Sequence, residues 1–389
     1  MKKIAILGFG VVGSGVAEVL TKNKSIIEAK LNEEVEIKYI LDIRDFPNSP
    51  FADKVVHDFN VILNDNEVKI VAEMMGGSHP AYDFSKAALL AGKNVITSNK
   101  EVVSKFGTEL LSIAKENNVR YLFEASVGGG IPIIRPLNND LVANKITAID
   151  GILNGTTNYI LTQMDVNGTS FFDALKQAQI NGYAEADPTA DVEGIDAARK
   201  IAILSSLSFG KCVPIDQITT QGITNITSED FEIAKALGYT IKLIAHSELI
   251  NGKIFATVSP RFVSLSNPLA HISDVYNGVL VGANMLDKVL FYGKGAGKLP
   301  TASAVVADIM DVVEKMNNQS ASIISWVDAK ENDIATIDNY YSTQCVIVDG
   351  FADGGKYIES INKTAIIMEN ASVLDCKKYG NCKIYTILE

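Results

Sequence analysis

Near its N-terminus the chain reads Ile4-Ala5-Ile6-Leu7-Gly8-Phe9-Gly10-Val11-Val12-Gly13. An apolar strand pattern runs directly into a Gly-x-Gly-x-x-Gly turn, and a helical pattern follows. In such a turn Gly8 permits the tight bend, Gly10 lets a phosphate approach the backbone, and Gly13 lets helix and strand pack closely. The helix N-terminus adds free N–H groups and a partial positive charge. The stretch therefore predicts a dinucleotide-binding fold, and the candidate cofactor contacts are Gly8, Phe9, Gly10, Val11, Val12 and Gly13.

The N-terminal part of the chain alternates short β-branched runs with helix-like stretches. The predicted strands are Ile4–Leu7, Ile37–Leu41, Ile70–Met74, Asn94–Thr97 and Arg120–Phe123, and the predicted helices are Gly13–Lys22, Ser85–Ala91 and Gly107–Glu116. This alternation is typical of βαβ units around a parallel sheet. We therefore expect an α/β fold whose first domain, a Rossmann-type parallel sheet, spans 1–135 and is completed by a helix at 301–316.

The pattern changes near Lys145 to longer amphipathic helices between scattered strands. The predicted strands are Ile146–Leu153, Ile254–Val258, Val279–Val281 and Val289–Tyr292, and the predicted helices are Thr156–Val166, Ser170–Asn181, Gly194–Leu207 and Ser228–Leu237. We expect an α+β catalytic and dimerisation domain with a mixed open sheet at 136–300. Residues 320–389 form a small C-terminal appendage in this prediction, with strands at Gln344–Val348 and Lys383–Leu388 and a helix near Tyr357–Asn362.

Composition excludes several classes of protein. The 389 residues include 35 Lys and Arg against 46 Asp and Glu, a net charge of −11 with no basic run, so neither nucleic acid nor an anionic membrane surface is an expected partner. No apolar stretch reaches the roughly 18 residues that a membrane span needs. The 4 cysteines lack zinc-ligand spacing and indicate reduced thiols in a cytoplasmic protein.

The residues after the second predicted strand bear on the choice of cofactor. They read Asp42-Ile43-Arg44-Asp45. An acidic residue here holds the ribose hydroxyls of NAD, whereas an arginine accommodates the 2′-phosphate of NADP. Asp42 favours NAD and Arg44 favours NADP, so the sequence leaves the choice between NADP and NAD open.

Two lysines lie where chemistry is expected. Lys100 follows the strand Asn94–Thr97 directly, at the edge of a parallel sheet where ligands bind. Lys200 ends an acidic tract that begins at Gly182, and it stands four residues after Asp196 on one helical face. Pro188 interrupts helix formation, so we expect Glu185 and Asp191 to lie in a loop.

Taken together, these motifs resemble homoserine dehydrogenase over roughly residues 1–320. The matching segments are Gly8–Gly13, Ser98–Lys100, Glu124–Pro132, Gly151–Ile160, Gly182–Lys200 and Gly293–Ala304. The resemblance implies NAD(P)-dependent interconversion of L-homoserine and L-aspartate 4-semialdehyde, a step in threonine, methionine and isoleucine biosynthesis. It also implies a small-molecule substrate and, with the predicted sheet, a homodimer.

The resemblance also implies roles for individual residues. Lys200 matches the general acid/base, Lys100 an active-site lysine near the nicotinamide, and Asp196 an acid that orients Lys200 and the substrate hydroxyl. The positions that match the substrate site are Glu185, Asp191, Gly155, Thr156 and Tyr183. Gly295 matches a later glycine near the cofactor, and Ser98 belongs to the matching segment Ser98–Lys100. Arg44, the candidate for contact with a 2′-phosphate, completes the predicted cofactor contacts. A monovalent-cation site for sodium, built mainly from main-chain carbonyls, matches Glu124, Val127, Gly129 and Ile131.

The tail departs from the family pattern. Many members carry a regulatory domain there, whereas this chain has only Asp349-Gly350-Phe351-Ala352-Asp353-Gly354, which suits either a degenerate regulatory domain or an unrelated appendage.

Two other functions remain to be weighed. A phosphorylating semialdehyde dehydrogenase would need a nucleophilic cysteine, and none stands in a catalytic-looking turn. A non-catalytic NAD(P)-binding regulator would not need Lys100, Asp196 and Lys200 together.

Overall fold

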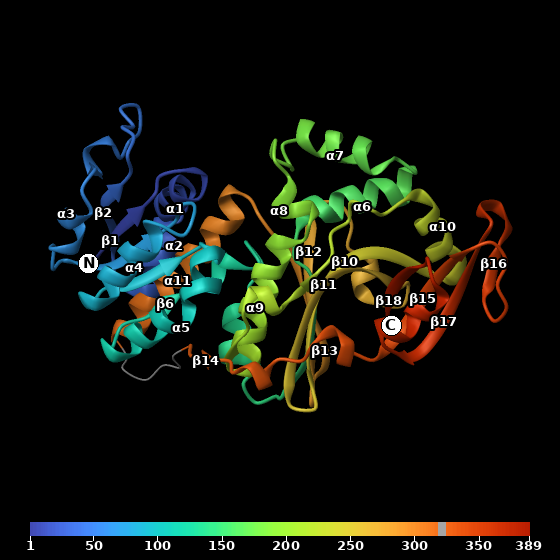
Figure 1. Ribbon diagram of the computed structural model, residues 1–389. Coiled ribbons are helices and arrows are strands. Elements are labelled where there is room, and N and C mark those ends of the chain that lie inside the picture. The colour runs from blue at the N-terminus through green and yellow to red at the C-terminus, as the bar shows by residue number, and fades with distance from the viewer. Residues whose placement is uncertain (318–323) are drawn as a thin grey trace. The chain divides into compact units, whose positions relative to one another are not determined.

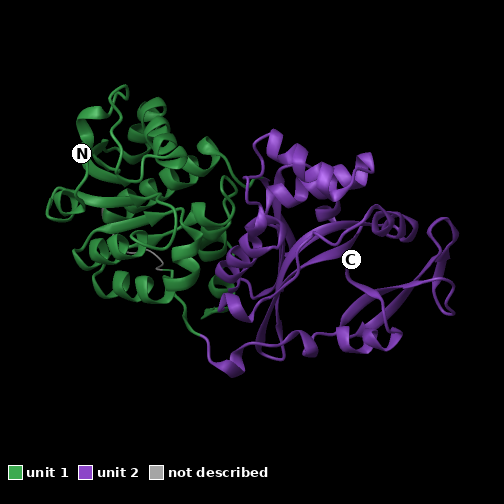
Figure 2. Cartoon of the chain, turned by 45° about the horizontal axis from the view of Figure 1, so that its top comes forward, with its two compact units in different colours: residues 1–143, 206–212, 294–328 green, residues 144–205, 213–293, 329–389 purple. Residues whose placement is uncertain are grey.

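The computed structural model describes residues 1–317 and 324–389. The chain forms two compact units, drawn in two colours in Figure 2. The first unit comprises residues 1–143, 206–212 and 294–328, and the second comprises 144–205, 213–293 and 329–389. In the described part of the chain no helix has the length and apolar character needed to cross a membrane.

The first unit is built on a six-stranded parallel sheet with the strand order β3-β2-β1-β4-β5-β6. Figure 1 labels its strands β1, β2 and β6. The strands are β1 (Lys2–Leu7), β2 (Val35–Leu41), β3 (Val55–Val56), β4 (Val68–Glu73), β5 (Asn94–Thr97) and β6 (Tyr121–Leu122). This order is that of a dinucleotide-binding sheet, and it confirms the predicted Rossmann-type fold. Register pairs Glu73 with Leu7 on one side and with Thr97 on the other, so β1, β4 and β5 end at the same edge.

The helices of the first unit form two packed groups, because right-handed crossovers place them on the two faces of the sheet. One group is α1 (Val11–Lys22), α2 (Lys24–Leu31) and α11 (Lys298–Asn317), and the other is α3 (Phe59–Leu63), α4 (Ala81–Leu90) and α5 (Lys100–Glu116). The close packing of α1 on α11 needs a glycine, since a Cβ atom at Gly15 would lie 2.8 Å from the carbonyl oxygen of Lys298.

The second unit is built on a ten-stranded mixed sheet, as the α+β pattern predicted. Its order is β13-β12-β7-β10-β11-β18-β15-β17-β16, and β9 pairs with β11 in addition. The strands are β7 (Ile146–Ile152), β9 (Thr219–Thr220), β10 (Tyr239–Ile250), β11 (Lys253–Ser264), β12 (Tyr276–Ala283), β13 (Asp287–Lys294), β15 (Ser342–Asp349), β16 (Lys356–Ile358), β17 (Lys363–Ala371) and β18 (Lys383–Leu388). Its helices are α6 (Gly155–Asn167), α7 (Phe171–Ile180), α8 (Thr189–Val192), most of α9 (Ile195–Phe209), α10 (Ser228–Leu237) and α12 (Val373–Cys376).

The C-terminal tail continues this sheet. Strand β18 pairs in parallel with β11, with Thr386 opposite Arg261, so residues 342–388 extend the sheet of the second unit. The predicted helix near Tyr357–Asn362 is wrong: the chain forms β16 and then a 3-10 turn at Glu359–Ile361. Antiparallel pairing of β16 with the adjacent β17 outweighs the weak helical pattern, because the stability of a strand depends on its packing against a partner, which local helical periodicity does not report.

Candidate active site

The glycine-rich turn has the geometry of an anion cradle. Gly8 adopts a positive φ of 86°, and a Cβ atom there would lie 3.0 Å from the carbonyl oxygen of Met74. At Gly13 a Cβ atom would lie only 2.0 Å from the Gly8 carbonyl oxygen, so these two positions require glycine. Gly10 caps α1 without a side-chain hydrogen bond, and a Cβ atom there would meet nothing within 4 Å. The backbone at Gly10, where α1 begins, is therefore open to a ligand, which fits the pyrophosphate of a dinucleotide.

A cavity of about 610 Å³ adjoins this turn. It is lined by Gly8, Gly10, Leu41, Asp42, Ile43, Arg44, His57, Phe59, Met74, Met75, Gly76, Pro80 and Phe84. Phe9, Val11 and Val12 of the glycine-rich turn do not line this cavity. The N–H of Phe9 donates to the Asp42 carboxylate over 2.8 Å. Val11 is exposed and Val12 is half-buried. The cavity thus combines an apolar wall with two charged groups, as a nucleotide site requires.

Asp42 and Arg44, the two candidates for cofactor selection, hold each other in this cavity. Arg44 Nε donates to Asp42 Oδ1 and Arg44 Nη2 to Asp42 Oδ2, each over 3.0 Å. The Arg44 guanidinium is the main reason that the pKa of Asp42 falls to about 2. His57 joins them: Nδ1 lies 2.7 Å from the Asp42 carbonyl oxygen and Nε2 lies 3.1 Å from Asp45 Oδ1. Both the acidic and the basic selector therefore belong to one hydrogen-bonded group.

Lys100 is the first residue of α5, and Ser98 and Asn99 connect it to the end of β5. Asn99 is the N-cap of this helix, and its side-chain oxygen accepts hydrogen bonds from the N–H groups of Glu101 and Val102. The N–H of Ser98 donates to the main-chain oxygen of Glu73 over 3.3 Å. Lys100 therefore belongs to the first unit and stands at the sheet edge where parallel sheets bind ligands.

The predicted cation-binding segment forms a tight loop next to Gly295. Gly129 adopts a positive φ of 56°, and a Cβ atom there would lie 2.4 Å from the carbonyl oxygen of Gly295. The N–H of Ile131 donates to the carbonyl of Gly128, which leaves the carbonyls of Val127, Gly129 and Ile131 as the candidate ligands. Hard monovalent cations prefer such neutral oxygens, and the loop geometry is compatible with a site of this kind.

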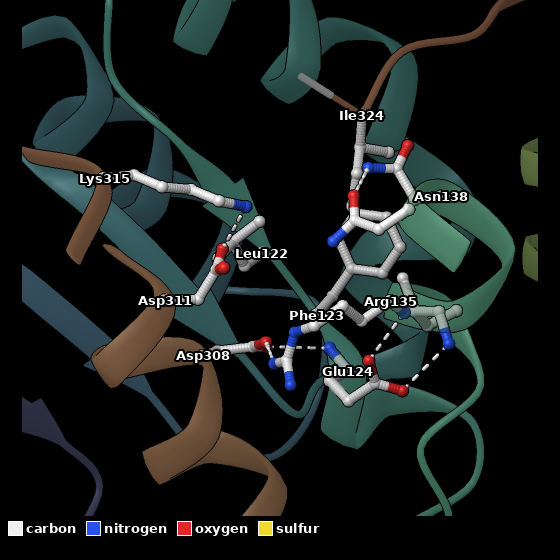
Figure 3. Close-up of a pocket in the computed structure, with 11 residues that line it drawn as sticks. Leu122, Phe123, Glu124, Arg135, Asn138, Asp308, Asp311, Lys315 and Ile324 are labelled. Atoms are coloured by element: carbon white, nitrogen blue, oxygen red, sulfur yellow. Dashed lines mark hydrogen bonds and ion pairs between the residues drawn. The ribbon is translucent and has the colours of Figure 1, made fainter. Parts of the chain in front are cut away.

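The Glu124 side chain has a different function in this loop, as Figure 3 shows. Its carboxylate accepts hydrogen bonds from the N–H groups of Ile133, Ile134 and Arg135 over 2.6, 2.8 and 2.7 Å. Asp308 lies beside it and is paired with Arg135 over 2.7 Å. Burial, and then the Glu124 charge, raise the pKa of Asp308, whereas Arg135 lowers it. The Glu124 carboxylate is therefore occupied by the following backbone turn. Glu124 can contribute to the cation site only through its main-chain carbonyl.

In the second unit, Lys200 lies at the centre of a buried polar cluster. Its Nζ atom is 2.8 Å from Asp196 Oδ2 and donates to the carbonyl oxygen of Leu153 over 2.6 Å. Lys200 is 7% and Asp196 4% exposed, so this ion pair is largely shielded from solvent. Helix α9 places the two residues one turn apart, as their spacing predicted.

Asn154 links this ion pair to the acidic tract. Its side-chain amide donates to Asp196 Oδ2 over 2.9 Å and to Asp191 Oδ1 over 2.7 Å. Asp191 lies in the short helix α8, so the expectation that it belongs to a loop is wrong: Pro188 precedes the helix as its N-cap and does not interrupt it. Sequence reasoning missed Asn154, although an asparagine between the predicted strand Ile146–Leu153 and a helix is a recognisable N-cap signal.

The remaining predicted substrate residues flank this cluster. The Thr156 hydroxyl donates to the carbonyl oxygen of Tyr183 over 2.6 Å, which fixes the Tyr183 backbone against α6. Gly155 packs so closely that a Cβ atom there would lie 2.7 Å from the Val275 carbonyl oxygen. Glu185 lies in the exposed loop after α7, and no hydrogen bond between described residues joins its carboxylate to Lys200 or Asp196.

Comparisons with known proteins agree with this geometry. Residues 8–124 match the family model for the homoserine dehydrogenase NAD binding domain, and residues 132–310 match the model for homoserine dehydrogenase. The chain is 42% identical over 318 residues to homoserine dehydrogenase of Lactococcus lactis, covering 80% of this chain and 74% of the relative.

Solved structures show the same similarity. A homoserine dehydrogenase from Thiobacillus denitrificans superposes with a TM-score of 0.88 at 31% identity, covering 100% of this chain and 98% of the other. A hyperthermophilic archaeal homoserine dehydrogenase in complex with NADPH gives a TM-score of 0.70 at 29% identity, covering 83% of this chain and 100% of the other. With an NAD-binding domain, a matching second unit and relatives of this similarity, the chain belongs to the homoserine dehydrogenase family, NAD(P)-dependent oxidoreductases of amino-acid biosynthesis.

Proposed function

We propose that Lys200 is the general acid/base in the interconversion of L-homoserine and L-aspartate 4-semialdehyde. A bound nicotinamide would supply the hydride acceptor for this oxidation. The Lys200 amine would take the hydroxyl proton of homoserine. In the reverse direction Lys200 returns the proton to the developing alkoxide. The observation that carries the proposal is the buried ion pair of Lys200 with Asp196, 2.8 Å apart.

Asp196 has the role of a positioning acid in this proposal. Its Oδ2 atom receives hydrogen bonds from Lys200 and from Asn154, so the carboxylate fixes the direction of the Lys200 side chain. The Leu153 carbonyl gives Lys200 a second anchor over 2.6 Å. A general base must be held within hydrogen-bond reach of the proton that it takes, and two anchors restrict Lys200 to that geometry.

The substrate ammonium needs carboxylates, and we assign Asp191 and Glu185 to it. Asp191 is supported by its link to Asn154, which places its carboxylate 2.7 Å from the same amide that contacts Asp196. Gly155, Thr156 and Tyr183 form the wall around the rest of the substrate in this assignment. The close approach at Gly155 and the hydrogen bond from Thr156 to Tyr183 keep that wall rigid.

In the first unit we assign cofactor binding to the glycine-rich turn, Arg44, Ser98 and Gly295, with Lys100 beside the nicotinamide. The cavity of about 610 Å³ and the position of Lys100 at the start of α5 support this assignment. The choice of NADP or NAD then depends on whether Arg44 leaves Asp42 for a 2′-phosphate.

We further propose a monovalent cation, sodium, held by main-chain carbonyls of Glu124, Val127, Gly129 and Ile131. The tight contact between Gly129 and Gly295 supports a structural role, because a cation there would stabilise a loop that packs on the cofactor segment.

A homodimer and a cytoplasmic location complete the proposal. Strand β13, at one end of the second sheet, exposes Tyr292 by 56% and Leu290 by 36%, and a second copy of the chain would cover these apolar side chains. All four cysteines are free thiols, as in a reducing compartment.

One assay tests the central proposal. Purified protein is incubated at alkaline pH with L-homoserine and either NAD or NADP, with sodium or potassium present, and the absorbance of the reduced cofactor is followed. We expect turnover that depends on Lys200. An active enzyme whose Lys200→Ala variant keeps most of the wild-type rate would refute the role of Lys200.

A further inference from the structure

Glu73, the last residue of β4, is a fully buried carboxyl group at the edge of the sheet where the cofactor cavity lies. One carboxylate oxygen accepts a hydrogen bond from the N–H of Met75 and the other accepts one from the Thr97 hydroxyl, each over 2.6 Å. Burying a carboxyl group is costly unless it is hydrogen-bonded, and here burial raises the pKa of Glu73 to about 7. An apolar residue would fill the same place in the strand, so the carboxyl group requires an explanation.

The first hydrogen bond holds the wall of the cofactor cavity. Met74, Met75 and Gly76 all line that cavity, and the N–H of Met75 is fixed by Glu73. The wall also touches the glycine-rich turn, because a Cβ atom on Gly8 would lie 3.0 Å from the Met74 carbonyl oxygen. A shift of this segment would therefore change the shape of the dinucleotide site.

The second hydrogen bond leads to Lys100. The Thr97 hydroxyl that donates to Glu73 also accepts from the N–H of Asn99 over 2.8 Å. Asn99 caps α5, and its side-chain amide donates to the carbonyl of Gly77 over 2.7 Å, beyond the cavity wall. Lys100 is the next residue, so the start of its helix is held by the same network.

We propose that Glu73 is a positioning residue that, through Met75 on one side and Thr97 with Asn99 on the other, holds the cofactor wall and the helix start of Lys100 in one arrangement. Two acceptor oxygens are needed because the two donors belong to different segments: the Met75 N–H lies in the turn after β4, and the Thr97 hydroxyl belongs to the last residue of β5. The proposal rests on the proposed place of Lys100 beside the nicotinamide, and it assigns the Glu73 network a share in setting that place.

Substitutions at Thr97 and Glu73 test the network. Thr97→Val keeps the shape of the side chain but removes the hydroxyl, and Thr97→Ser restores it. Glu73→Gln keeps an acceptor for Met75 but presents an NH₂ group that cannot accept from Thr97. The assays are kcat for homoserine oxidation at about pH 9, where the Glu73 carboxyl is ionised, and the Kd of NADPH from its fluorescence on binding.

We expect Thr97→Val to lower kcat by about tenfold, because misplacing a reacting group by a fraction of an ångström has effects of this order. The Kd of NADPH should stay within about twofold for this variant, since the Met75 link is intact. Thr97→Ser should recover most of the wild-type kcat. Glu73→Gln should match Thr97→Val, and the double variant should lose no more than either single variant, because both remove one shared interaction.

Thr364→Val is the matched control. Thr364 is as buried as Thr97 and its hydroxyl also donates to one oxygen and accepts from one N–H, but it lies in β17 of the tail. This variant should lower the melting temperature without changing kcat or Kd. If Thr364→Val lowers kcat as much as Thr97→Val, or if Thr97→Ser is no better than Thr97→Val, the network has only a structural role and the proposal is overturned.

The Lys100→Ala variant distinguishes an error in the proposed position of Lys100 from an error in the proposed role of Glu73. If this variant keeps the wild-type kcat, the proposed place of Lys100 is wrong and the Glu73 proposal falls with it. If Lys100→Ala loses activity while Thr97→Val and Glu73→Gln both keep the wild-type kcat and Kd, the Glu73 proposal alone is overturned.

Discussion

Lys200 Nζ lies 2.8 Å from Asp196 Oδ2, one helical turn away on α9, and both side chains are buried. A buried pair of this kind restricts the lysine to one direction, and it costs desolvation energy that must be offset by hydrogen bonds. The contacts with Leu153 and Asn154 provide them. We therefore interpret Asp196 as the residue that orients the Lys200 side chain.

The first prediction concerns the two members of this pair. Lys200→Ala should lower kcat by about 10² to 10⁴-fold, the range for loss of a general acid/base. Asp196→Asn should lower kcat by less, because the amide still fills the space but no longer pairs with the ammonium. Steady-state kinetics with homoserine measures both. Lys176→Ala, at an exposed lysine of α7, is the control and should leave kcat unchanged; equal losses in all three variants would contradict the assignment.

The second prediction concerns Asn154, which contacts Asp191 and Asp196 and also caps α6. Asn154→Asp keeps the cap but adds a third carboxylate to the cluster, so activity should fall far more than stability. Asn154→Ala should cost about 1 kcal/mol of unfolding free energy through the lost cap. Urea unfolding and the KM for homoserine separate the two effects. Ser170→Ala, which removes the cap of α7, serves as the control that should lower stability alone.

The third prediction concerns cofactor choice. Arg44→Ala should weaken NADP by about 10 to 100-fold in kcat/KM, the range for a charge-assisted hydrogen bond, and leave NAD nearly unchanged. The freed Asp42 carboxylate could even improve NAD binding. Binding of 2′,5′-ADP against 5′-AMP gives a second measurement without turnover. The same loss with NADP and NAD would show that Arg44 does not contact the 2′-phosphate.

The fourth prediction concerns pH and Glu73. Burial raises the pKa of this carboxyl to about 7 in the folded chain, so it binds its proton more tightly than in the unfolded chain. Its stabilising contribution is present below the unfolded pKa near 4.5 and is lost as pH rises through about 7. The loss is on the order of 3 kcal/mol from the size of the shift. Urea unfolding across this window should show a smaller decline for Glu73→Gln than for wild type; parallel curves would argue against a shifted pKa.

Several functional elements could be read from the sequence because they are local. The Gly8–Gly13 turn is recognisable because its glycine spacing is local. The structure confirms that Gly8 and Gly13 require glycine, and it leaves the backbone open at Gly10, the N-cap of α1. The spacing of Asp196 and Lys200 fixes their shared face because a helix repeats every 3.6 residues. The parallel arrangement of the first sheet likewise follows from the βαβ alternation.

Other features depended on contacts between distant segments. Strand β10 went unpredicted because Lys242 and His246 interrupt its apolar pattern, yet it pairs along its length with β11. Asn154 joins two carboxylates 37 and 42 residues away, and Glu73 meets Thr97 across 24 residues. Sequence by itself determined the glycine-rich turn, the parallel sheet and the helix that carries Asp196 and Lys200, because short-range geometry dictates them. Only the tertiary structure decided which buried polar groups share hydrogen bonds, because those partners are chosen by packing between elements and leave no periodic signal.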